Sequence, residues 1–251
     1  RRPPIFAALA ILAAAGGAAL YLRLGAHTSH VRSVAVLPLE NHSGDPGQDY
    51  FADGLTEVLT GDLAKIRTLR VVSRTSAMHY KKTTKLAPEI ARELRVDALV
   101  EGSVVRSGDR VQIRIQLIRG STDEHLWAES YERELKDILR LQSEVALAIA
   151  RAIQARLSPE EQVRFSGRRP VNQDAFDAYL RGRYSWNERT PAAIHAAIGH
   201  FRAAIQADPA YAPAYAGLAD CYNQLGTLII GERPPSETRP LAVAAARQAL
   251  E

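Results

Sequence analysis

The sequence predicts an α/β domain with a mixed sheet, followed by an all-α array of paired helices and preceded by one transmembrane helix. Three observations predict this fold class: an apolar stretch near the start, an alternation of strand and helix patterns ending in a meander, and a purely helical remainder. The boundaries that follow are an anchor at 1–24, a linker at 25–32, the α/β domain at 33–157, a linker at 158–173 and the helical repeats at 174–251.

The apolar stretch runs from Ile5 to Leu22, has arginines on both sides, and is about long enough to cross a bilayer as one helix. A secretory signal peptide is the main alternative, because Arg1-Arg2 resembles a charged n-region before an apolar h-region. No small-x-small cleavage site follows before His30. A buried soluble helix would have no polar face for solvent. We therefore predict a single-pass anchor.

The positive charge of the chain is concentrated beside this stretch. The net charge is +4, yet residues 33–166 hold 19 Lys and Arg against 20 Asp and Glu, and residues 167–251 hold 9 against 8. Because nucleic-acid binding needs a concentrated basic patch, we expect no nucleic acid to bind this chain. The flanking arginines nearly balance across the stretch, so the positive-inside rule sets no orientation.

Hydrophobic periodicity places the elements of the α/β domain. Apolar residues recur every three or four positions from Phe51 to Ile66, which indicates a helix with one buried face. Ser107-Gly108-Asp109 lies between two alternating segments and is a hairpin signal. The expected elements are strands at 33–39 and 69–73, helices at 49–66 and from Pro88, strands at 98–105, 111–118 and 125–133, and a helix at 136–157.

Beyond the second linker, small and aromatic residues recur at spacings typical of helix pairs. Small residues let two helices approach closely, and aromatic side chains fill the gaps between them. The spacing returns at Ala242, and no capping helix follows, so we expect a fragment of a longer tetratricopeptide array. The predicted packing positions are Ala197, Phe201, Ala204 and Pro209 in one helix and its turn, and Tyr215, Leu218, Ala219 and Tyr222 in the next.

Four segments in order resemble a known family, the TolB-like amino-terminal domain of bacterial transmembrane signalling proteins. They are residues 33–46 (SVAVLPLENHSGDP), 50–57 (YFADGLTE), 96–104 (VDALVEGSV) and 124–131 (EHLWAESY). The resemblance implies a domain that follows one membrane span and precedes tetratricopeptide repeats. It also implies a cytoplasmic effector on the amino-terminal side, such as a winged-helix domain, a kinase or a cyclase.

No residue pattern predicts catalysis. The sequence has no Ser-His-Asp order, metal tetrad or glycine-rich nucleotide loop, so we expect no enzyme activity, cofactor or metal in this chain. Asp45, Asp49 and Asp53 near the first helix are candidates for a cation site. We prefer helix capping, because Asp there satisfies free amides and no calcium-type loop follows.

Three further sequence features each allow a structural and a functional interpretation. Trp127 and Tyr131 share one strand face and are candidates to line a ligand or partner surface, although core or edge packing is preferred. Gly102 in a strand is read as a bulge or close approach and not as a phosphate loop. The polar segment 75–85, with two adjacent lysines, is read as a solvated connection in preference to a mobile loop.

The histidines and the single cysteine are given structural roles. His27 and His30 are read as parts of a solvated linker, and His195 and His200 as surface positions. Cys221 has no partner for an intramolecular disulfide, and its apolar helical context predicts a small buried side chain.

These expectations define a function. We expect the extracytoplasmic sensor or protein-interaction part of a membrane-anchored bacterial signalling or transcriptional regulatory protein. It would span the cytoplasmic membrane once, with the carboxyl-terminal part in the periplasm, and bind protein partners through the tetratricopeptide groove; a homodimer is compatible with this. The alternative is an exported TolB-like envelope assembly protein with a cleaved signal peptide. A third reading keeps the soluble part in the cytoplasm.

Overall fold

The computed structural model describes residues 31–166, 171–227 and 230–250, so the predicted span from Ile5 to Leu22 lies outside the described residues. Among the residues that it describes, no helix is long and apolar enough to cross a membrane. Residues 32–251 belong to one compact unit. The strands are β1 Ser33–Val36, β2 Glu40–Asn41, β3 Arg70–Val71, β4 Ala98–Ser107, β5 Arg110–Arg119 and β6 Glu124–Glu134. The α-helices are α2 Asp49–Ala64, α3 Arg74–Met78, α4 Ala87–Leu94, α5 Ile138–Ala152, α6 Pro159–Ser166, α7 Gln173–Asn187, α8 Pro191–Ala207, α9 Ala212–Leu225 and α10 Pro235–Gln248, with short 3-10 turns η1 Pro46–Gln48 and η2 Leu135–Asp137.

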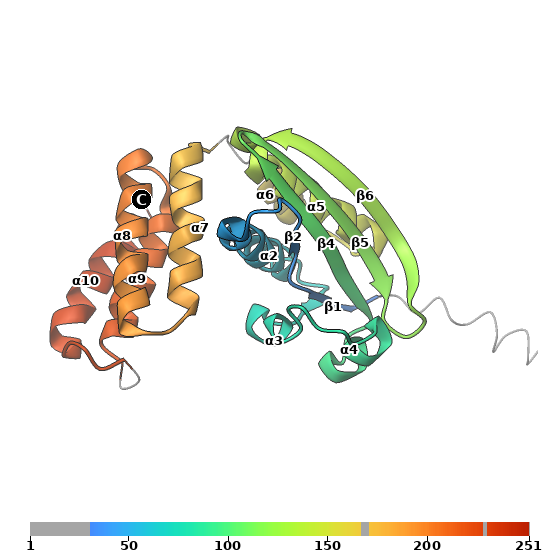
Figure 1. Cartoon of the computed structure of the whole chain (residues 1–251), viewed down its shortest axis with the longest axis horizontal. Helices are drawn as coiled ribbons and strands as arrows, with labels where there is room; N and C mark the ends of the chain where they lie inside the picture. The colour runs from blue at the N-terminus through green and yellow to red at the C-terminus, as the bar shows by residue number, and fades with distance from the viewer. Residues whose placement is uncertain (1–30, 167–170, 228–229, 251) are drawn as a thin grey trace, which may run out of the picture. The chain divides into compact units, whose positions relative to one another are not determined.

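The first part of the chain is an α/β fold with a mixed sheet, as the sequence predicts. The strand order is β3-β1-β4-β5-β6, and β2 pairs with β4 beyond the end of β1. β1 runs parallel to β3 and β4, whereas β4, β5 and β6 form an antiparallel meander. Gly108 adopts a left-handed backbone (φ 57°) in the turn between β4 and β5, which explains the predicted hairpin signal. Figure 1 shows the meander as three long, curved strands.

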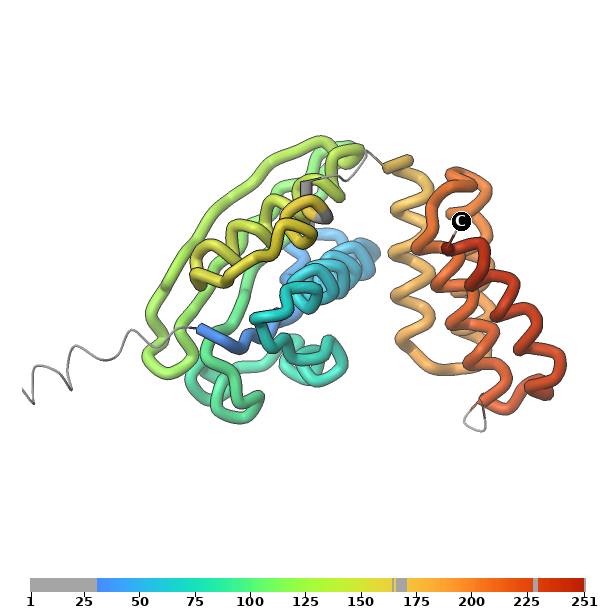
Figure 2. Tube along the Cα trace, turned by 180° about the vertical axis from the view of Figure 1, so that it is seen from behind, coloured from blue at the N-terminus to red at the C-terminus, as the bar shows by residue number. Residues whose placement is uncertain are grey.

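Helices cover both faces of this sheet because the strand side chains alternate in direction. Ala35 and Leu37 pack with Ile90 and Ala91 of α4 on one face. Val34 and Val36 point to the other face and are fully buried. α2 and α5, which contact each other, lie together on one side of the meander (Figure 2).

The second part of the chain is purely helical, also as predicted. Asn172 and Thr190 cap the first two of its helices by accepting hydrogen bonds from the backbone N–H groups three residues on. Phe201 of α8 is fully buried between Gly182 of α7 and Gly217 of α9. A Cβ atom on Gly182 or Gly217 would lie 2.6 or 2.5 Å from the Phe201 ring, so only glycine permits this close approach.

Four local features differ from the predicted elements. The predicted linker at 158–173 contains the helix α6, β2 forms directly after the predicted strand at 33–39, and α3 overlaps the segment 75–85 that was interpreted as a connection. The predicted helix to Leu157 ends five residues early, at Ala152. Gln154 takes a left-handed backbone (φ 56°), and Ala155 N–H donates to the Ala150 carbonyl (2.8 Å). This stop is a Schellman-like turn without glycine, which the hydrophobic pattern alone does not reveal.

Candidate functional site

A cavity of about 1080 Å³ opens at the carboxyl end of β1. The chain leaves β1 through α2 to β3 on one side and returns through α3 and α4 to β4 on the other side. In open α/β sheets, ligands bind in the crevice at such a switch point. The walls come from the loop after β1, the start of α2, the turn between α3 and α4, and the middle of β4, β5 and β6. Its place in the topology makes this cavity the candidate functional site.

Gly102 lies in the sheet wall of the cavity. A Cβ atom there would lie 2.1 Å from the Arg114 carbonyl oxygen on the paired strand β5. The strands therefore approach closely at this point, as the sequence predicted, and glycine permits the local bend of a curved sheet.

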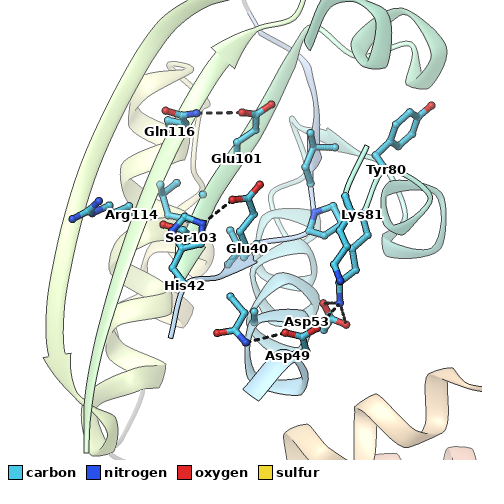
Figure 3. A pocket seen from close by; sticks show the side chains of 18 of the residues that line it. Glu40, His42, Asp49, Asp53, Tyr80, Lys81, Glu101, Ser103, Arg114 and Gln116 are labelled. Carbon is cyan, nitrogen blue, oxygen red and sulfur yellow. Dashed lines mark hydrogen bonds and ion pairs between the residues drawn. The ribbon is translucent and has the colours of Figure 1, made fainter. Parts of the chain in front are cut away.

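An ion pair joins two walls of the cavity. Asp53 of α2 is only 4% exposed, and both of its carboxylate oxygens accept hydrogen bonds from the Lys81 ammonium, at 2.7 and 2.8 Å. Lys81 follows the short helix α3, so the pair fastens the α3–α4 turn to α2 (Figure 3). The sequence analysis names Asp53 as a candidate for a cation site and includes Lys81 in the polar segment 75–85. The two residues are 28 positions apart, and nothing in the sequence indicates that they form a pair.

The aspartates near the start of α2 have separate structural partners. Asp45 accepts a hydrogen bond from Gly47 N–H (2.8 Å) and caps the 3-10 turn η1. Asp49 accepts from the Asn41 amide (2.8 Å) and Asp53 pairs with Lys81, so the capping interpretation holds for Asp45. No group of three or more metal-ligating side chains occurs among the described residues.

The sheet wall of the cavity is polar and carries carboxylates. Glu101 of β4 is half-buried, and its carboxylate accepts a hydrogen bond from the Gln116 amide (3.2 Å). Glu40 of β2 pairs with His42 (2.8 Å). Figure 3 shows the Arg114 side chain directed away from Glu101 and Glu40. The guanidinium therefore does not neutralise this wall.

The side of α2 that faces α7 carries a second, denser network. Tyr50 donates its hydroxyl hydrogen to Asp177 of α7, and the same carboxylate accepts from Arg106 of β4 and from Arg181 (2.9 Å). Burial, and then the hydrogen bond to Asp177, raise the pKa of Tyr50 to about 12. Burial alone would raise the pKa of Asp177, but the hydrogen bonds from Tyr50 and both arginines outweigh it and lower that pKa.

One and two turns further along α2, the same face makes close contacts. A Cβ atom on Gly54 would lie 2.7 Å from Leu180 of α7, so the two helices are in direct contact there. Glu57 pairs with Arg183 of α7 (2.5 Å) and accepts a hydrogen bond from the Asn187 amide (3.1 Å). α2 is therefore shared between the cavity and the helical part of the chain.

The predicted packing positions of the helical part lie in one neighbourhood, with one exception. Ala197, Phe201 and Ala204 are fully buried on α8. On α9, Ala219 is buried, Tyr215 is half-buried, and Leu218 and Tyr222 pack against the cluster around Phe201. Pro209 is exposed in the turn between α8 and α9, where it cannot continue a helix and ends the pair without packing into it.

Trp127 and Tyr131 are half-buried on β6, opposite Leu117 and Ile113 of β5. They share a face, as predicted, but neither lines the cavity, which takes Ala128, Glu129 and Ser130 from this strand. Burial, and then a hydrogen bond to Glu129, raise the pKa of Tyr131. Both residues therefore pack on β6, the strand at one edge of the sheet, as the preferred interpretation has it.

The remaining candidates have structural places. Cys221 is fully buried, as predicted, and burial raises the pKa of its thiol to about 12. His195 is partly exposed and lies 2.8 Å from a carboxylate oxygen of Glu232. His200 is half-buried, and burial followed by the charge of Arg181 lowers its pKa.

Two sequence comparisons find proteins that are similar to this chain. A family model described as HilA/YgeH-like transcriptional regulator, second domain, matches residues 29–147. The chain is also 38% identical over 217 residues to the protein named "Putative adenylate cyclase 3" from Rhizobium meliloti (strain 1021). That match covers 84% of this chain but 36% of the relative, so the chain spans about a third of that protein's length.

Solved structures similar to part of the chain include TolB and the LpoB carboxyl-terminal domain. TolB from Acinetobacter baumannii matches with a TM-score of 0.37 and 16% identity, over 49% of this chain and 28% of that one. The LpoB carboxyl-terminal domain from Escherichia coli matches with a TM-score of 0.34 and 21% identity, over 44% of this chain and 89% of that one. Both TM-scores are below 0.5, and these likenesses carry no argument about function.

Proposed function

We propose that the chain is a non-catalytic input module of a bacterial signalling or transcriptional regulatory protein, in which α2 relays occupancy of the cavity to the helices α7–α10. One observation carries the proposal: α2 places Asp53 in the cavity and Tyr50, Gly54 and Glu57 against α7. A rigid helix that belongs to both places transmits a shift at one of them to the other.

The two sequence relatives support an input role, because their names describe different outputs. One is a transcriptional regulator, matched in its second domain, and the other is named a putative adenylate cyclase, matched over about a third of its length. A segment common to both is better explained by a regulatory role than by either output chemistry. The effector chemistry would then reside elsewhere in the longer protein.

Hydrogen–deuterium exchange on the full chain tests the relay. Asp53→Asn weakens the pair with Lys81 on the cavity side of α2, and we expect faster amide exchange in α7 as well as in the α3–α4 turn. The matched control is Glu93→Gln. This change weakens the ion pair between Glu93 of α4 and Lys85 of the same turn, and it does not alter a contact of α2. Unchanged exchange in α7 for the Asp53 variant would remove the basis of the relay.

The placement in the cell is part of the same proposal. The apolar stretch Ile5–Leu22 would anchor the chain in the cytoplasmic membrane with α7–α10 on the periplasmic side, where they would act as tetratricopeptide repeats and bind a protein partner. A phosphatase reporter fused after Glu251 tests the topology. Activity of the fusion supports translocation, and an inactive but stable fusion contradicts it.

A further inference from the structure

We infer that the cavity takes a short peptide with a free amino end and a free carboxyl end. This inference rests on the proposed function, because it names the ligand class of the same cavity. It is carried by two side chains of opposite charge, Glu101 and Lys82, which line the cavity from different walls. Neither has a counter-charge among the described residues.

Glu101 supplies the site for an ammonium group. Its carboxylate is half-buried and accepts a hydrogen bond from the neutral amide of Gln116, and Figure 3 shows Arg114 of the same wall pointing away from it. A partly desolvated carboxylate gains more from a charged donor than from an amide. Glu40 of the same wall adds negative charge, since its partner is a histidine.

Lys82 supplies the site for a carboxylate. Its two lysine neighbours in the turn are already neutralised, because Lys81 pairs with Asp53 and Lys85 pairs with Glu93 (2.6 Å). Lys82 has a left-handed backbone (φ 59°). The turn is fixed around it by the hydrogen bond from Thr83 N–H to the Tyr80 carbonyl (3.1 Å). The turn therefore presents one uncompensated cation from a defined position.

The shape of the cavity selects a peptide over a free amino acid. Glu101 lies on β4 and Lys82 lies in the turn between α3 and α4, which are separate walls of the cavity, so a ligand that reaches both must carry its two charges on well separated atoms. A free amino acid carries them on adjacent carbons. The volume of about 1080 Å³ suits a larger molecule, because it lies just above the usual range for small-ligand sites. Leu37, Pro38 and Ile90 give apolar surface for its side chains.

Isothermal titration calorimetry on the full chain tests this ligand class. The probe is an equimolar pool of tetrapeptides with varied central residues, prepared with free ends, with an acetylated amino end, or with an amidated carboxyl end. We expect the free pool to bind and each blocked end to weaken binding about tenfold, as for one lost charge-assisted hydrogen bond.

Three variants identify which residue holds which end. Glu101→Gln should make binding insensitive to acetylation, and Lys82→Gln should make it insensitive to amidation. Arg114→Gln is the matched control, a charge removed from the same wall but directed away, and should keep both sensitivities. Thermal unfolding confirms that each variant is folded.

Absence of binding by the free pool at millimolar concentration overturns the inference, and so does equal binding of free and blocked pools. These failures are separate from a failure of the relay. If the pool binds with the expected end preferences but α7 exchange never changes, the ligand class stands and the relay falls. If the Asp53 variant changes α7 exchange but no pool binds, the relay stands and the peptide is excluded.

Discussion

The two sides of α2 are held in different ways. Toward α7, Phe51 packs edge-to-face on Phe176 with ring centroids 6.5 Å apart, Gly54 lies against Leu180, and charged groups at both ends have several partners. Toward the cavity, α2 is held by polar contacts: Asp53 and more distantly Asp49 pair with Lys81 of the α3–α4 turn, and Asp49 also accepts a hydrogen bond from the Asn41 amide. Apolar contact and shared ion pairs resist movement, whereas a few polar contacts to a short turn and a loop yield more easily.

This difference suits an input helix. A ligand in the cavity then has only a few polar contacts of α2 to displace. The contacts between α2 and α7 must stay intact, so that α7 moves together with α2 and does not slide over it. The comparison therefore predicts large losses of stability for changes on the α7 side and small ones on the cavity side. The following variants test that order.

The largest loss is expected for Phe176→Ala. Phe176 is fully buried, and deleting a buried aromatic ring costs about 3–5 kcal/mol of the free energy of unfolding. Urea denaturation of the full chain measures this loss. Tyr184→Ala on the same helix is the control, because Tyr184 is 37% exposed and its truncation should cost clearly less than that of the fully buried ring. Equal losses for the two variants would show that α7 does not pack on α2 in this way.

Gly54→Ala should destabilise by about 1–3 kcal/mol, because its Cβ would lie 2.7 Å from Leu180 and force the helices apart. Gly61→Ala in the same helix is a matched control. A Cβ at Gly61 has no atom within 4 Å, so this change should stabilise by about 0.4–1 kcal/mol through the unfolded chain. Opposite signs in thermal denaturation support the contact, and stabilisation by both variants contradicts it.

Asp177 predicts a dependence of stability on pH. Its pKa is lowered in the folded chain, so its contribution is fully present above the pKa of the unfolded chain, about 3.9, and is lost as the pH falls through the folded value. Asp177→Asn should therefore be less stable than the parent at neutral pH, with the difference shrinking below about pH 4. Asp174→Asn, an exposed position on the same helix, controls for the loss of a carboxylate. A difference that stays constant down to pH 2 would contradict this role.

Periodicity predicted the sheet and most helices because local patterns determine them. The alternation from Val111 to Leu117 became the buried face of β5, and the apolar spacing from Phe51 to Leu63 became the core face of α2. Features held by long-range contacts were missed. β2 is a two-residue strand defined by its pairing with β4, and α6 is held by Glu161, which accepts from Arg67 N–H (3.0 Å).

The candidate site was harder to predict than the fold. Asp53 was found as a possible cation ligand and Lys81 as part of a polar connection, but their pairing depends on how α3 returns over the sheet. Trp127 and Tyr131 attracted attention as large aromatic residues, yet the cavity uses the small and polar positions beside them. The switch point itself depends on the spatial order of the strands, with β1 between β3 and β4, and the order of elements along the chain does not determine this.

The smallest effect is expected on the cavity side, for Lys81→Met. Methionine keeps the length of the side chain and removes the charge, leaving the carboxylate of Asp53 without its cation. Because Lys81 is partly exposed and water can reach the carboxylate, we expect a loss of only about 1 kcal/mol, well below that of an enclosed pair. A double-mutant cycle with Asp53→Asn isolates the pair, and the coupling energy should account for most of that loss. Phe176 packs on Phe51 and takes no part in this ion pair, so the effect of the Phe176 variant should add to that of Lys81→Met independently. A loss for Lys81→Met as large as that for Phe176→Ala would mean that both sides of α2 are equally rigid, and the asymmetry on which the relay depends would be gone.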